Sequence, residues 1–149
     1  MSDIRIPSWL FEFVRESNKI EGIHRAPTDA EILATAKFIA LPKLTVEDLI
    51  SLVAVYQPNA VLRDREGLNV RVGKHVPPRG SPKIREHLQL FLAALGQHTP
   101  HAAHIMYEKL HPFTDGNGRS GRAIWLWQMK ESPLGFLHHF YYQTLQAAA

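Results

Sequence analysis

Apolar residues recur every three or four positions along most of the chain, which is the pattern of amphipathic helices. In the first such stretch one helical face carries Leu10, Phe13, Val14, Ser17 and Glu21. Gly22 follows and can end this helix. The pattern therefore predicts an N-terminal helix within residues 8–22.

Helix-start signals precede four further apolar repeats. Two are capping-box patterns, formed by Thr28 with Glu31 and by Thr45 with Asp48. Two are N-cap residues followed by proline, Ser81 and Thr99. We expect these helices to end near Phe38, before Pro58, before Gly96 and near Leu110, and two more to span about 118–130 and 135–146.

Residues 61–80 break the helical period. Leu68, Val70 and Val72 alternate there with Asn69 and Arg71, between glycines and prolines. Alternation with a period of two is typical of a strand, so we predict a short β-hairpin, or flap. The expected fold is mainly α: a single domain over residues 1–149, built as a helical bundle with a hairpin flap beside the active site.

Composition narrows the class of protein. Lysine plus arginine number 17 and aspartate plus glutamate 14, and the net charge of +3 is too small for a strong nucleic-acid surface. Cysteine is absent, which excludes disulfide scaffolds, thiol nucleophiles and thiolate metal sites. The longest apolar run, residues 49–56, is far shorter than the ~20 residues of a membrane helix. We expect a soluble, cytoplasmic protein with no nucleic-acid or membrane partner.

Two other groups of residues suggest less specific roles. Six basic residues gather around the predicted flap, and we expect them to lie on the solvated surface: Arg63, Arg65, Arg71, Lys74, Arg79 and Lys83. The chain has nine histidines, and three of them follow one another at intervals of three: His98, His101 and His104. This spacing lacks the i, i+4 pair and carboxylate of a catalytic zinc helix, so we expect His104 to be packed behind the active site.

The run from His111 to Arg122 has the parts of a phosphate site. A glycine-rich turn precedes a predicted helix, whose first N–H groups attract anions, and Arg119 and Arg122 lie one turn apart. Asp115 suits Mg²⁺ held between protein and phosphates, and His111 suits a general base. Such turns also join helices without a function. However, two arginines at the positive end of a helix are unfavourable unless an anion or carboxylate accompanies them.

This run resembles the signature of the Fic (filamentation induced by cAMP) family: His, any residue, Phe, any residue, Asp or Glu, Gly, Asn, Gly, Arg, two further residues, Arg. Every fixed position is filled between His111 and Arg122. Ala103, His104 and Leu110 resemble the preceding Fic helix, and residues 71–75 resemble the family's target-docking hairpin.

The resemblance implies transfer of AMP from ATP to a Ser, Thr or Tyr hydroxyl of a target protein, with Mg²⁺ as cofactor. His111 would deprotonate the hydroxyl and Asp115 would bind Mg²⁺, while Phe113 would be structural. The other implied roles are an anion hole of Gly116, Asn117 and Gly118, a β-phosphate contact from Arg119 and a γ-phosphate contact from Arg122. A Doc-like kinase branch carries lysine at the position of Gly118, so glycine favours AMP transfer.

Glu21 is unusual because it lies on the apolar stripe of its helix, where a carboxylate needs a partner such as arginine. Ser17, Glu21 and Gly22 also resemble the Fic inhibitory motif. The resemblance implies that Glu21 pairs with Arg122 and displaces the γ-phosphate, while Ser17 steadies the helix. The alternative is an ordinary helix end with Glu21 exposed.

Several alternatives stay open. The same site could remove AMP or transfer another phosphate-containing group, and the chain could be a toxin with a separate antitoxin or a nucleotide-binding module without activity. Residues 68–72 could dock a target through its backbone or form an ordinary hairpin edge. The target protein and the formation of a homo-oligomer are not determined by the sequence.

Overall fold

The computed structural model describes residues 4–129, which form a bundle of α-helices. The helices are α1 (Leu10–Ile20), α2 (Asp29–Ile39), α3 (Val46–Tyr56), α4 (Pro82–Ala93), α5 (Pro100–Leu110) and α6 (Asn117–Met129), with a short 3₁₀ turn, η1 (Leu95–Gln97), after α4. The prediction of a mainly helical fold is confirmed. The predicted helix at 135–146 lies outside the described residues.

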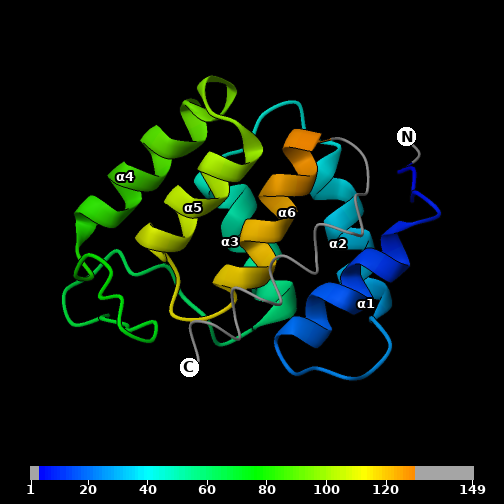
Figure 1. The fold of residues 1–149 in the computed structure, drawn as a ribbon, viewed down its shortest axis with the longest axis horizontal. Helices are drawn as coiled ribbons and strands as arrows, with labels where there is room; N and C mark the ends of the chain where they lie inside the picture. The colour runs from blue at the N-terminus through cyan, green and yellow to red at the C-terminus, as the bar shows by residue number, and fades with distance from the viewer. Residues whose placement is uncertain (1–3, 130–149) are drawn as a thin grey trace.

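Helix α6 occupies the centre of the bundle. It contacts α5 on one side and α1, α2 and α3 on the others, as its place in Figure 1 shows. Its side chains from Arg119 to Leu126 are all buried, which is the pattern of a helix surrounded by protein. The first two turns of α6, which carry the two arginines of the predicted phosphate site, therefore lie close to several other helices.

Two apolar clusters hold the helices in place. The larger one joins α3, α4, α5 and the middle of α6, and it includes Leu49, Leu88 and Tyr107. The smaller one packs α1 against α2 and the far part of α6 through Leu10, Phe13, Val14, Ala36 and Leu126. The stripe predicted for the first helix is thus the face that attaches α1 to the bundle.

The predicted helix starts are confirmed. Both capping boxes form: the side chain of Thr28 accepts from the backbone N–H of Glu31, that of Thr45 accepts from Asp48, and each acid accepts from the N-cap backbone. Ser81 and Thr99 cap α4 and α5, each with proline in the first turn. None of the described helices combines the length and apolar character needed to cross a membrane.

The predicted β-hairpin at 61–80 is wrong, because the described chain has no strand there. A tight turn pairs Val72 with His75 through reciprocal backbone hydrogen bonds of 3.0 and 2.9 Å, and the pairing extends no further. Pro77 and Pro78 have no N–H with which to extend this pairing. The carbonyls of Leu68 and Pro78 accept hydrogen bonds from the Arg63 side chain instead. The alternating sequence pattern corresponds only to alternating burial: residues 68, 70 and 72 are half-buried, whereas residues 69 and 71 are exposed.

Glu31 fastens the start of α2 to α1. Its buried carboxylate accepts from the Arg25 guanidinium at 2.9 and 3.1 Å, from the Thr28 backbone at 2.8 Å and from Asn18 of α1 at 3.5 Å. Burial opposes its ionisation, but the hydrogen bonds from Arg25 and Thr28 outweigh burial and lower the pKa of Glu31.

We predict that Glu31→Gln lowers the free energy of unfolding at neutral pH by about 1–3 kcal/mol, because the amide cannot replace a carboxylate between these donors. The pKa of Glu31 is lower in the folded protein than in the unfolded chain. The carboxylate therefore contributes fully to the free energy of unfolding above its unfolded pKa, and this contribution is lost as the pH falls through the folded pKa. Denaturant unfolding should therefore show a gap between wild type and variant that closes in acid. A constant gap would contradict the assignment.

Candidate active site

His111 ends α5 in an unusual backbone conformation. It is the C-cap residue, with φ 48° and ψ 62°, and its N–H donates to Tyr107 O at 2.9 Å. The left-handed region is uncommon for a residue with a side chain and persists where surrounding contacts enforce it. Burial lowers the pKa of His111, the charge of Arg63 lowers it further, and Glu108 partly opposes both. The imidazole is therefore neutral at neutral pH, as a general base must be.

The turn between α5 and α6 is held by its own side chains. Asn117 bridges it, since its Oδ1 accepts from Phe113 N at 2.9 Å and its Nδ2 donates to Phe113 O at 2.8 Å. The ring of Phe113 is buried, which agrees with the structural role expected of it. The Asn117 side chain therefore holds the turn and is occupied by Phe113. In the predicted anion hole, Asn117 would contribute its backbone N–H at the helix start.

Asp115 is exposed on this turn. One oxygen, Oδ1, accepts from Gly116 N at 2.7 Å, and no hydrogen bond within the described chain is assigned to Oδ2. No group of three or more His, Asp or Glu residues within 4–129 is arranged to hold a metal ion. A single carboxylate suits Mg²⁺ that is shared with substrate phosphates, because Mg²⁺ keeps waters and takes one or two protein carboxylates in such sites.

Arg119 is buried without hydrogen-bond partners for two of its nitrogens. Only 4% of the residue is exposed, and its Nε and Nη1 have no acceptor within the described chain. The guanidinium lies over the ring of Tyr56 at 5.2 Å, a cation–π contact from α3. Burial raises the pKa of Tyr56 to about 12, and its hydroxyl shares a hydrogen bond of 2.6 Å with Thr35. Tyr56 was not among the residues predicted from sequence.

Arg122 is buried and donates hydrogen bonds to the N-terminal helix. Its Nε donates to Ser17 Oγ at 2.7 Å, and its Nη2 donates to Ser17 O at 3.0 Å and to Glu21 Oε1 at 2.8 Å. Burial lowers the pKa of Arg122, and the charge of Glu21 partly restores it. The structure thus brings together Ser17, Glu21 and Arg122, as the sequence predicted.

Glu21 occupies the C-cap of α1 rather than the interior of that helix. Its N–H donates to Asn18 O, and 37% of its side chain is exposed although it pairs with Arg122. Glu21 therefore ends the helix, as the alternative expected, and also pairs with Arg122, as the resemblance implied; its inhibitory role stays a prediction. A Cβ on Gly118 would overlap Glu21 Oε1, so the missing side chain at 118 lets the carboxylate approach the start of α6.

Behind these residues lie polar contacts within and between α5 and α6. Tyr107 and Ser120 share a hydrogen bond of 2.7 Å, and His104 pairs with Glu108 at 2.8 Å. The packed position predicted for His104 is confirmed, because 2% of it is exposed.

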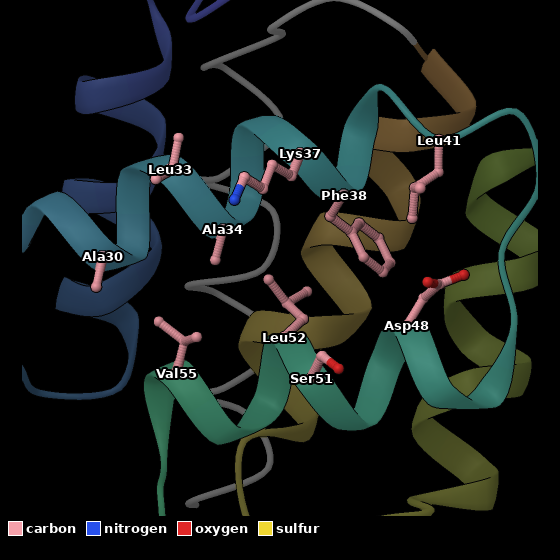
Figure 2. Close-up of a pocket in the computed structure, with 10 residues that line it drawn as sticks. All are labelled: Ala30, Leu33, Ala34, Lys37, Phe38, Leu41, Asp48, Ser51, Leu52 and Val55. Atoms are coloured by element: carbon pink, nitrogen blue, oxygen red, sulfur yellow. The ribbon is translucent and has the colours of Figure 1, made fainter. Parts of the chain in front are cut away.

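A separate pocket of about 380 Å³ lies between α2 and α3 (Figure 2). Leu33, Ala34, Leu52 and Val55 make it mostly apolar, and Lys37 lies at its margin. None of its lining residues belongs to the run from His111 to Arg122, so it is not part of the candidate active site.

The comparison with protein families agrees with the site. The Fic/DOC family model matches residues 35–129. The chain therefore belongs to the Fic/DOC family, whose members are generally transferases that act on proteins and typically transfer AMP or other nucleotidyl groups. No curated protein and no solved structure matches the chain. Helix α1, with Ser17 and Glu21, precedes the matched region.

We predict that the His111 imidazole titrates below the ordinary histidine pKa of 6.5, because burial and Arg63 both disfavour its protonated form. NMR titration of histidine-labelled protein measures this, with the resonance assigned by its loss in His111→Gln. Titration of that resonance above pH 6.5 would contradict the described environment.

Proposed function

We propose that this protein is a protein adenylyltransferase that transfers AMP from ATP to a Ser, Thr or Tyr hydroxyl of a target protein. The observation that carries the proposal is Arg119, a buried guanidinium at the start of α6 with two nitrogens that have no acceptor among residues 4–129. An uncompensated buried cation is costly, and a helix N-terminus attracts anions, so the two features together call for a bound anion. The triphosphate of ATP is such an anion.

The neighbouring groups extend this anion site to a triphosphate. We assign the β-phosphate to Arg119, the γ-phosphate to Arg122 and the anion hole to the backbone N–H groups of residues 116–118, which glycine leaves open. Guanidinium groups bind phosphate oxygens in a bidentate manner. Asp115 would hold Mg²⁺, which when bound supplies charge neutralisation to the phosphates.

His111 is proposed as the base. Its neutral imidazole takes the proton from the target hydroxyl, whose oxygen attacks the α-phosphorus, and pyrophosphate leaves as the new phosphodiester bond forms. The reaction depends on in-line placement of hydroxyl and leaving group. We assign target docking to residues 68–72, where exposed Asn69 and Arg71 alternate with half-buried neighbours.

We further propose that α1 inhibits the enzyme. Glu21 and Ser17 accept three hydrogen bonds from Arg122, the guanidinium assigned to the γ-phosphate. A γ-phosphate that reaches Arg122 must replace Glu21, because two anions cannot share this donor without repulsion. Gly118 supports the same arrangement, since a Cβ there would overlap Glu21 Oε1 in the position where it pairs with Arg122.

We predict that Glu21→Gly raises AMP transfer at least about tenfold, because Arg122 then becomes available to the γ-phosphate. Lysate proteins are incubated with ATP labelled on the α-phosphate, and protein-bound label is counted. The matched control is Glu16→Gly, which changes a glutamate on the same helix that pairs with Lys19 and not with Arg122. Transfer by Glu21→Gly at or below the wild-type rate, with folding intact, would refute the inhibition. Label carried only by γ-labelled ATP would indicate a kinase instead.

We predict that His111→Ala in the Glu21→Gly background abolishes transfer and leaves ATP binding within about twofold, since a base acts in the chemical step alone. Calorimetry measures binding and the labelling assay measures transfer. A full rate in this variant would exclude His111 as the base.

A further inference from the structure

Arg63 lies inside the protein, although the sequence placed it among the solvated basic residues. Its exposure is 0%, and the surface prediction for it is wrong. The guanidinium donates four hydrogen bonds: Nε to His111 O at 2.7 Å, Nη2 to Leu110 O at 2.8 Å, and Nη1 to Pro78 O at 2.8 Å and to Leu68 O at 3.2 Å. One side chain thus binds the end of α5 and both ends of the segment 68–78.

The partners of this cation are all backbone carbonyls. Burial lowers the pKa of Arg63, and none of the acceptors of its four hydrogen bonds is a carboxylate. The negative end of the α5 dipole supplies part of the compensation, because Leu110 and His111 are its last carbonyls. A buried arginine without a carboxylate partner is costly, so we expect it to fix backbone positions that an apolar residue could not hold.

That purpose is visible at His111. Besides the carbonyls of Leu110 and His111, the next one along the chain, Pro112 O, accepts from the backbone N–H of Arg63 at 2.9 Å. Three consecutive carbonyls are therefore bound by one residue. They flank the left-handed backbone of His111, a conformation that requires enforcement by its surroundings.

The segment 68–78 is closed by the same group. Leu68 O and Pro78 O meet at one nitrogen, and Ser81 N donates to Arg63 O at 3.1 Å just beyond. Gly80 fits because a Cβ there would overlap the carbonyls of Arg65 and Leu68. The base of the segment is therefore packed tightly around the guanidinium.

We propose that Arg63 is a positioning residue that fixes the His111 backbone and both ends of the segment 68–78 as one unit. A target segment docked on residues 68–72 then presents its hydroxyl at a constant place relative to the imidazole. The catalytic base and the docking segment come from the proposed function, whereas the unit itself rests on the four hydrogen bonds.

The charge and the shape of Arg63 have separable effects. Arg63 and His75 disfavour the imidazolium of His111, whereas Glu108 favours it through its charge and a backbone hydrogen bond. Lysine at 63 keeps the positive charge but lacks the planar fork that reaches four carbonyls. Methionine removes both. Comparing the two variants distinguishes placement of the base from tuning of its protonation.

The experiment uses Arg63→Lys and Arg63→Met, each alone and in the Glu21→Gly background, with Arg65→Met as control. Arg65 is an exposed arginine two positions away. Four measurements are made: hydrogen exchange by residue, NMR titration of the His111 imidazole, ATP affinity by calorimetry, and label transfer. The first three do not depend on transferase activity, so they decide the role of Arg63 even if the proposed function fails.

For Arg63→Lys we expect faster hydrogen exchange at residues 64–80 and 110–114 but not in α2, an imidazole titration close to wild type, unchanged ATP affinity and transfer reduced about tenfold or more. For Arg63→Met we expect the same local loosening and a higher imidazole pKa. Arg65→Met should match the parent protein in all four measurements.

Unchanged hydrogen exchange and full transfer in Arg63→Lys would overturn the proposal. Global unfolding of both Arg63 variants would also overturn it, because Arg63 would then be a general structural residue.

Discussion

A buried guanidinium must satisfy both its charge and its N–H groups, and this requirement shapes the centre of the molecule. Three arginines are buried among residues 4–129, and their partners differ. Arg63 uses four backbone carbonyls, Arg122 uses Ser17 and Glu21, and Arg119 uses the face of Tyr56 while two of its nitrogens have no acceptor. Within the described part of the chain, the incomplete set of partners is that of Arg119 at the start of α6, where we propose that an anion binds.

The same requirement connects the N-terminal helix to the proposed chemistry. Helix α1 is attached to the bundle by its apolar stripe, and this attachment carries Ser17 and Glu21 to Arg122. In the proposed function, the carboxylate of Glu21 and the γ-phosphate of ATP are alternative anions that neutralise the same cation, Arg122. The proposed regulation therefore needs no movement of the core, only an exchange of anions at Arg122.

Local signals in the sequence predicted much of the fold. Capping boxes and proline-marked starts located α2 to α5, because a cap satisfies N–H groups within four residues of itself and needs no distant partner. The hairpin prediction failed because a strand, unlike a helix cap, needs a partner that local sequence does not specify. Alternation reports which residues face inward, and it does not report whether a second strand is available to pair; here the carbonyls of Leu68 and Pro78 bind Arg63 instead.

The sequence by itself determined that the run from His111 to Arg122 joins two helices and predicted a partner for Glu21, because residue type and helical spacing are local properties. The resemblance predicted the pairing of Glu21 with Arg122, and only the tertiary structure decided the partners of the other groups. Ser17 and Arg122 lie 105 positions apart, and Arg63 and His111 lie 48 apart. Charge and spacing alone cannot distinguish a buried Arg63 from an exposed Arg65, since burial is set by the packing of helices that are distant in sequence.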